Sequence, residues 1–350
     1  MNAARAGKTK KPSFWGGKRK QMAPDAVIRD AQASMARLNS RSTNSRFSDL
    51  STLRESYFHD ARSYFTLCAM TRRRSIDAES KARGLNKLYA FRSILEQKIL
   101  ADLIESFGSE GVIQMALSGS FFGYSKKQGV SIRYSLQSCV PTTTCGGRCY
   151  AHDGRDRELG HIIRGVLNFH VGSRYESGDR VARSCIMEKL SQHVESAIRN
   201  ALEDREMALA SGYKRSARIR FSHIGEMAQT PAFTNALAKA IKQRCPHVLC
   251  VVYTRHPKAH MLDPTVLTIN FTLEGQTDPR LKLVPSGARI VSSAWDGVLN
   301  PDAAINFLEH HVEKAAHAVG RGNICPVTLN HDVTPSCDSA RCQKCFVRPL

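Results

Sequence analysis

Four short segments between residues 217 and 294 constrain the fold most strongly. They are rich in apolar and β-branched residues, and several alternate apolar with polar side chains. The segments are ARIRFS at 217–222, VLCVVYT at 248–254, VLTINFTL at 266–273 and ARIVSSA at 288–294. Period-two alternation is typical of β-strands. Because a helical pattern over 232–244 separates the first two segments, we expect parallel pairing with right-handed crossovers.

The third segment indicates that the sheet is curved. Its alternate positions form two sets, one apolar (Leu267, Ile269, Phe271, Leu273) and one polar (Thr268, Asn270, Thr272, Glu274). An ordinary doubly wound sheet is apolar on both faces. We therefore predict an α/β protein built as an incomplete (β/α) barrel, with a largely parallel sheet around a polar interior.

The chain divides into four predicted parts. Residues 1–46 hold eleven Lys and Arg against Asp25 and Asp30 and are expected to form a disordered basic arm. Residues 47–110 are a helical extension, and residues 111–320 are the partial barrel, with further helices over 158–170, 183–210 and 302–319. Residues 321–350 are a Cys-rich, metal-binding tail.

A loop with three cysteines follows a predicted strand over 131–138. Cys139, Cys145 and Cys149 have the spacing C-x5-C-x3-C, and a Gly-Gly pair between the last two lets the loop curl. Three soft ligands leave a four-coordinate metal with one open position, where chemistry takes place. A rival interpretation adds His152 and gives a closed Cys3His zinc site of purely structural role.

A second cysteine set lies near the C-terminus. Its four members are Cys325, Cys337, Cys342 and Cys345, enough to complete a tetrahedral site. Either a structural zinc or a fully ligated second cluster fits this set. It either pins the tail or transfers electrons.

The charge of the chain predicts an anionic partner. The formal net charge is +20, which favours nucleic acid. Clustered cysteines favour a reducing compartment and metal binding, so we expect a cytoplasmic protein. We expect no membrane span, because no apolar run reaches the roughly 18–20 residues required. The sequence gives no indication of oligomeric state.

The chain from about Cys139 to its end resembles the phage and plasmid "gene product eighty-eight" family. The resemblance rests on the cysteine loop ending in Cys-Tyr-Ala, the strand leading into Gly225-Glu226, the Tyr-Thr strand end at 253–254, and the terminal cluster opening with Cys-Pro at 325–326. It implies that the chain comes from a mobile genetic element.

More distantly, the order strand, three-cysteine loop, helix, strand, Gly-Glu resembles the radical S-adenosylmethionine superfamily. This resemblance implies a [4Fe–4S] cluster on Cys139, Cys145 and Cys149, with Gly225 and Glu226 holding the amino group of S-adenosylmethionine. Asn270 and Ser293, on the expected inner face, are candidates to bind the same cofactor. The chain departs from the superfamily in its cysteine spacing, which is usually C-x3-C-x2-C, and in having Ile224 where the first Gly of a Gly-Gly-Glu segment would stand.

Three functions are compatible with these features. The first is a radical S-adenosylmethionine-like redox enzyme that acts on or near nucleic acid. The second is a non-enzymatic nucleic-acid-binding protein with structural zinc or iron–sulfur sites. The third is a cluster that is structural or senses redox state without turning over a substrate.

Overall fold

The computed structural model describes residues 22–41, 46–73, 75–125, 129–142, 145, 149–152, 154–212, 216–275, 277–294 and 299–308. Within these residues the chain forms six α-helices and a seven-stranded, mostly parallel sheet. The prediction of an α/β protein is therefore confirmed. The second cysteine set lies outside the described residues.

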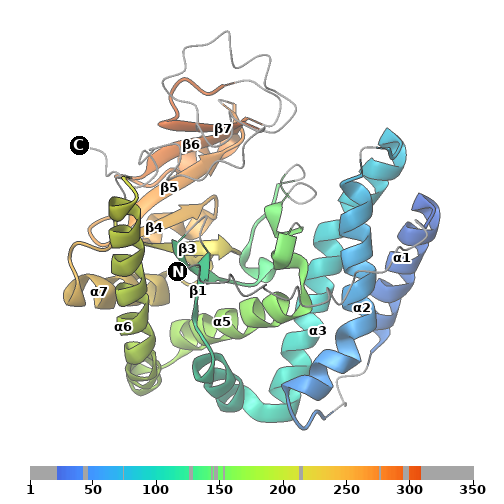
Figure 1. Ribbon diagram of the computed structural model, residues 1–350, viewed down its shortest axis with the longest axis horizontal. Coiled ribbons are helices and arrows are strands. Elements are labelled where there is room, and N and C mark those ends of the chain that lie inside the picture. Colours follow the sequence, from blue (N-terminus) through green and yellow to red (C-terminus); the bar gives the residue numbers. More distant parts are fainter. Residues whose placement is uncertain are drawn as a thin grey trace, which may run out of the picture.

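The strands of the sheet stand side by side in the order in which they occur in the chain (Figure 1). They are β1 (Phe122–Ser125), β2 (Gly129–Arg133), β3 (Arg218–Ile224), β4 (Leu249–Thr254), β5 (Thr268–Leu273), β6 (Arg289–Ala294) and β7 (Ile305–Leu308). β1 pairs with β2 in antiparallel orientation, and every later pair is parallel. The carboxyl ends of β2 to β7 consequently lie at one edge of the sheet.

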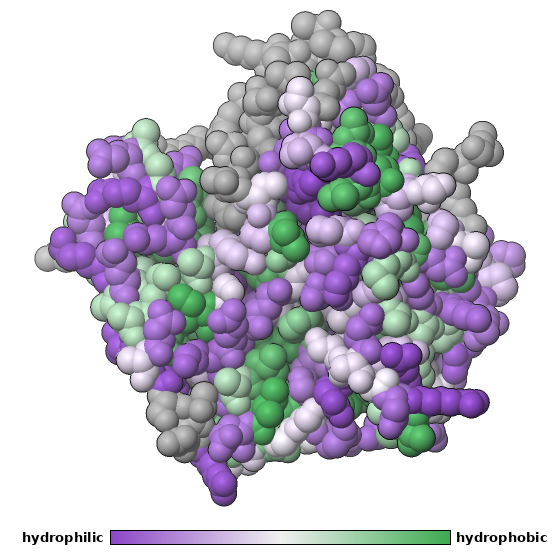
Figure 2. Space-filling view, turned by 180° about the vertical axis from the view of Figure 1, so that it is seen from behind, coloured by the Kyte–Doolittle hydropathy of each residue, from purple (hydrophilic) through white to green (hydrophobic). Residues whose placement is uncertain are grey.

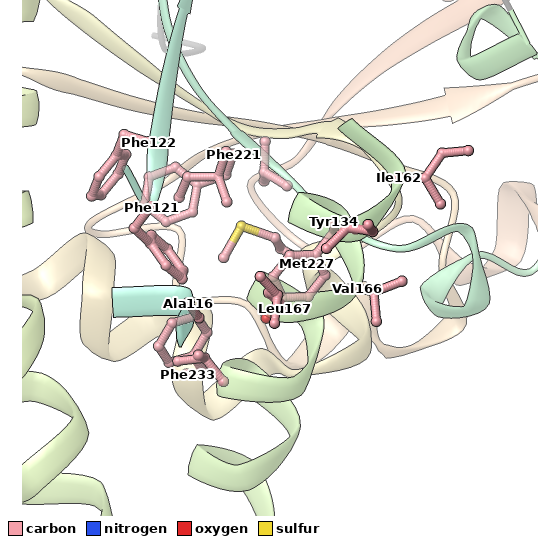
Figure 3. Close-up of a cluster of buried hydrophobic side chains, with 14 of the residues drawn as sticks. Ala116, Phe121, Phe122, Tyr134, Ile162, Val166, Leu167, Phe221, Met227 and Phe233 are labelled. Carbon is pink, nitrogen blue, oxygen red and sulfur yellow. The ribbon is translucent and has the colours of Figure 1, made fainter. Parts of the chain in front are cut away.

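Helices α5 (Leu159–Ser177), α6 (Arg180–Ala210) and α7 (Pro231–Arg244) pack against one face of the sheet. Figure 3 shows side chains of this core, among which the Phe121 ring lies 5.5 Å from the Phe122 ring and 6.1 Å from the Phe233 ring, centroid to centroid. The contact between α5 and the end of β2 is close. A Cβ on Gly165 would lie 2.8 Å from the Tyr134 carbonyl oxygen, so glycine is what allows this approach.

Each face of the sheet carries an apolar cluster, so the face opposite the helices is not the polar interior that the alternation predicted. Val252, Ile269 and Phe271 belong to the large core under the helices. Val251 and Val291 form a separate cluster with Ile305, and the register puts this cluster on the opposite face. The later crossovers contain short 3-10 helices, η5 (Pro257–Met261) and η6 (Pro279–Leu283), so the strand–helix alternation holds only for the first half of the sheet.

The helical extension consists of α1 (Pro24–Ser40), α2 (Leu50–Thr71) and α3 (Ala78–Ser118), which pack side by side (Figure 1). Helix α3 buries an apolar stripe formed by Leu88, Phe91, Leu95, Ile99 and Leu103. Gly108 has φ +67° and interrupts the helix, which then continues to Ser118.

Two sequence predictions are wrong within the described residues. Residues 24–40 are helix α1 instead of part of a disordered arm, because Val27, Ile28, Ala31 and Leu38 form a buried stripe against α2 and α3. The stripe includes small residues, so the helical periodicity of apolar residues is weak in the sequence. A helix was expected over 302–319, but Ile305–Leu308 form strand β7. These residues pair with the edge of β6 that β5 leaves open.

The predicted strand over 131–138 is also shorter than expected. β2 ends at Arg133, and residues Leu136–Ser138 form the 3-10 helix η1. The alternation of apolar residues predicted too long a strand, because Ile132, Tyr134 and Leu136 are all buried although only Ile132 lies in β2. The Ser135 hydroxyl accepts from the Gln137 N–H at 3.1 Å, which caps η1 and ends the strand geometry.

Figure 2 shows the molecule from behind, and on this face hydrophilic side chains surround several hydrophobic groups, of which one is elongated and lies at the lower centre. Among the described helices, none combines the length and apolar character needed to cross a membrane.

Candidate cofactor site at the carboxyl edge of the sheet

Four neighbouring parallel strands deliver polar and thiol groups to the same edge of the sheet. The cysteine loop follows β2, Glu226 follows β3, Arg255 follows β4 and Glu274 follows β5. In parallel α/β sheets the groups that bind ligands are those at the carboxyl ends of the strands. This edge is therefore the candidate site.

Gly225 allows the end of β3 to lie directly against the segment that opens the cysteine loop. It has φ +71°, and an added Cβ would lie 2.4 Å from the Ser135 carbonyl oxygen and 2.8 Å from Ser138 Oγ. The next residue uses this closeness, because the Glu226 N–H donates to Ser138 Oγ at 2.7 Å. Glycine is therefore required by both backbone conformation and space.

Glu226 is a buried carboxylate held between β3 and β4. Its Oε2 accepts from Thr254 Oγ1 at 2.6 Å and from the Arg255 N–H at 3.2 Å. Burial raises the pKa of Glu226, although the hydrogen bond from Thr254 and the charge of Arg255 oppose that rise. All of these contacts use one oxygen of the carboxylate.

The structure brings the three cysteines of the loop together, and each is partly buried. A hydrogen bond from Cys149 lowers the pKa of Cys145 to about 7. Burial raises the pKa of Cys139, and the charges of Glu226 and Cys145 add to that rise. The pKa of Cys149 is raised, first by its hydrogen bond to Cys145 and then by burial. The thiols thus interact with one another and with Glu226.

A polar network fastens the middle of the loop to the ends of β4 and β5. Thr142 Oγ1 donates to Glu274 Oε1, and the same carboxylate oxygen accepts from Arg255 Nη1 at 2.7 Å. The Cys145 N–H in turn donates to Thr142 Oγ1 at 3.0 Å. Burial alone would lower the pKa of Arg255, but Cys145, Glu226 and Glu274 raise it. Arg255 is therefore a cation held close to the thiols.

Helix α3 holds both ends of the loop through a buried ion pair. Arg92 Nε and Glu96 Oε1 are 2.6 Å apart, and both side chains are fully buried. Glu96 Oε2 accepts from Ser135 Oγ at 2.5 Å and from the Leu136 N–H at 2.7 Å, before the first cysteine. Arg92 Nη1 donates to the Asp156 carbonyl oxygen at 3.0 Å, beyond the last cysteine. The helical extension is thus part of the site.

The three thiols of the loop are the residues that could hold an iron–sulfur cluster. In the described part of the chain, no group of three or more His, Cys, Asp or Glu side chains is arranged so that it could hold a single metal ion. A [4Fe–4S] cluster makes a different demand, because each thiolate binds its own iron. Three partly buried thiols on one loop, beside the Arg255 cation, are compatible with that demand.

His152 lies on the side of the loop that faces α2. Its Nδ1 is 2.6 Å from the Tyr64 hydroxyl, and its ring packs edge-on against the Tyr64 ring. Within the described residues His152 joins no metal-binding group with the thiols. The structure therefore does not assemble the closed Cys3His zinc site.

The other predicted cofactor residues lie on the sheet itself. Asn270 is buried in the middle of β5, and Ser293 is half-buried near the carboxyl end of β6. The register puts Asn270 beside Arg289, and Ser293 lies four residues further along β6, so both are on the face opposite the helices. Ser293 is thus near the carboxyl edge, and Asn270 is deeper in the sheet.

Several residues of the site were missed by the sequence analysis. Arg255 and Glu274 had a usable signal, since each is a charged residue directly after a predicted strand. Arg92 and Glu96 also had one, because they are opposite charges four residues apart within the apolar stripe of α3.

The fold and the site together define an α/β protein with a sequentially ordered parallel sheet and a three-cysteine loop at its carboxyl edge. Comparison of the chain with protein-family models, with curated proteins and with solved structures finds no match in any of the three. The two family resemblances described above therefore stay predictions.

Proposed function

We propose that this protein is an iron–sulfur, radical S-adenosylmethionine-like redox enzyme that acts on or near nucleic acid. The observation that carries the proposal is the contact between the cysteine loop after β2 and the Gly225-Glu226 segment after β3. A thiol set beside a buried carboxylate is the arrangement that a cluster and an amino-group-bearing cofactor require. The strand order, which runs from β1 to β7 without a reversal, supports a partial barrel.

The residues of the chain have separate tasks in this proposal. Cys139, Cys145 and Cys149 bind the cluster, which supplies one-electron chemistry when bound. Glu226 accepts hydrogen bonds from the amino group of S-adenosylmethionine with its second carboxylate oxygen, while Thr254 fixes the first. Ser293 and Asn270 line the adjoining face of the sheet. Cys325, Cys337, Cys342 and Cys345 bind a second cluster or zinc.

Three further parts of the proposal have separate support. Contact with nucleic acid is supported by the net charge of +20. Origin in a phage or plasmid is supported only by the resemblance of the cysteine loop and tail to the "gene product eighty-eight" family. A cytoplasmic location is supported by the clustering of free cysteines.

The first test is the iron and acid-labile sulfide content of anaerobically purified protein. We expect the Cys145→Ala/Cys149→Ala variant to lose about four iron and four sulfide relative to the wild type. A matched control is Cys185→Ala/Cys245→Ala. It removes one thiol within α6 and one directly after α7, both outside the cysteine loop. The control should keep the full content.

The same measurement decides between the enzyme and its alternative. Zinc without sulfide in the wild-type protein would contradict the proposal and favour the nucleic-acid-binding protein with structural metal sites. If iron is present, Glu226→Gln should keep the iron and weaken S-adenosylmethionine binding at least tenfold. Unchanged binding in Glu226→Gln would favour a structural or redox-sensing cluster.

A further inference from the structure

The outer face of α2 carries cationic and aromatic side chains along one line. Arg54, Phe58 and Arg62 follow one another at four-residue steps, and Phe65 lies on the same side of the helix. The two arginines are exposed, Phe58 is 40% exposed and Phe65 is half-buried. Phe58 therefore presents part of its surface to solvent between two exposed arginines.

Two arginines from the segment after the cysteine loop extend this line. The guanidinium of Arg157 lies over the Phe65 ring, 3.9 Å from its centroid. Arg164 of α5 donates from Nη1 to the Ser120 carbonyl oxygen, and its pKa is lowered by burial and by the charges of Arg133 and Arg54. We call the set Arg54, Phe58, Arg62, Phe65, Arg157 and Arg164 the cationic strip.

The strip keeps a positive charge when its neighbours are counted. Glu55 and Glu158 are the exposed carboxylates adjacent to it in sequence, so arginines outnumber carboxylates by four to two. Asp156 is also close, but its carboxylate is engaged by Arg133 at 2.6 Å and His223 at 3.2 Å. A surface of this sign favours an anionic partner.

The strip is also connected to the candidate site. Only seven residues separate Cys149 from Arg157, and the contact between His152 and Tyr64 attaches this part of the chain to α2. The strip therefore adjoins the segment that follows the cysteine loop.

We propose that the cationic strip binds single-stranded nucleic acid. Arginines at the spacing of one helical turn contact the phosphate backbone, and exposed Phe58 stacks on a base, which every base sequence allows. Double-stranded nucleic acid presents no free base faces to an aromatic side chain, so the mixture of charge and aromatic surface favours single strands. This inference deepens the nucleic-acid part of the proposed function and needs no cluster.

The test is the affinity of the full-length protein for fluorescent single-stranded DNA and RNA oligonucleotides of the same mixed sequence, over a range of salt. Arg54→Gln/Arg62→Gln should weaken binding and lower the slope of log affinity against log salt by about 1.4, because two phosphate contacts are lost. The matched control is Arg199→Gln/Arg205→Gln, which removes two exposed arginines from α6. The control should keep affinity and slope.

The aromatic part of the strip needs its own variant. Phe58→Ala should weaken single-strand binding by about tenfold and leave the salt slope unchanged, because stacking involves no counterions. Met207→Ala is the control, since Met207 is 58% exposed on α6 and lies outside the strip. All of these side chains are exposed, so the variants should fold as the wild type does.

Three outcomes would overturn the inference. They are wild-type affinity in the α2 variants, an equal loss in the α6 control, and a Phe58→Ala protein that discriminates single strands from inorganic polyphosphate no less than the wild type. A higher affinity for DNA or for RNA would identify the natural strand type. If the protein holds no iron but the α2 variants lose affinity, the inference stands while the proposed enzyme fails.

Discussion

Gly225 is the residue on which the junction of β3 and the cysteine loop depends. We expect Gly225→Ala to destabilise the protein by about 3 kcal/mol or more, because a left-handed conformation and a clash with the Ser135 carbonyl oxygen act together. Chemical denaturation monitored by circular dichroism measures this cost.

Gly275 is a matched control for this substitution. It also has positive φ (+95°), but an added Cβ would meet nothing within 4 Å. Gly275→Ala should therefore cost only the conformational strain, about 1–2 kcal/mol. Equal costs at the two positions would show that the close contact at Gly225 is unimportant.

His256 makes stability depend on pH at the end of β4. Burial, helped by the charge of Lys258, lowers the pKa of His256 to about 4, and its Nδ1 accepts from the Lys258 N–H at 3.1 Å. Between pH 4 and 6.5 the unfolded chain binds a proton here that the folded chain does not. This contribution to stability is therefore complete above pH 6.5 and is lost as the pH falls towards 4.

We expect the wild type to lose roughly 1–2 kcal/mol more than His256→Asn between pH 7 and pH 5. Asn can cap the same turn but does not ionise, so the difference between the two proteins measures the effect of protonating His256. Urea midpoints of the two proteins at each pH measure the difference. Parallel pH profiles would contradict the prediction.

At the scale of elements, α3 determines the position of the cysteine loop. Glu96→Gln would leave Arg92 as a buried charge without its partner, so we expect a loss of about 3–5 kcal/mol in stability. The exposed pair Arg83–Glu79 on the same helix, also four residues apart, is the control. Arg83→Gln should cost less than about 1 kcal/mol. Similar losses in urea denaturation would rule out a special role for the buried pair.

The elements themselves were largely predictable. The four strands between residues 217 and 294 begin and end within two residues of their predicted bounds, because their apolar alternation coincides with real pairing. Strand β1 was missed because Phe122–Ser125 is a short edge strand with little pattern of its own. Helix α1 was missed because its buried face uses alanine and serine beside Val27, Ile28 and Leu38.

At the scale of the whole molecule, positive charge is spread beyond the N-terminus. Seven of the 51 Lys and Arg residues and no Asp or Glu lie in residues 1–21, so the rest of the chain keeps a formal charge of +13. We expect deletion of residues 1–21 to reduce the salt dependence of single-strand binding without abolishing binding, because the cationic strip remains. Fluorescence anisotropy at several salt concentrations measures this, and complete loss would assign binding to the N-terminal segment.

The sequence by itself determined the α/β class, the positions of the four strands between residues 217 and 294, the two unlike faces of β5 and the grouping of Cys139, Cys145 and Cys149 in one loop. These are local properties, since periodicity and spacing act over a few residues. Only the tertiary structure decided that Glu226, Arg255 and Glu274 surround that loop and that Arg92 and Glu96 of a separate helix hold its ends. Such contacts join residues far apart in the chain, and no local pattern encodes which strand ends become neighbours.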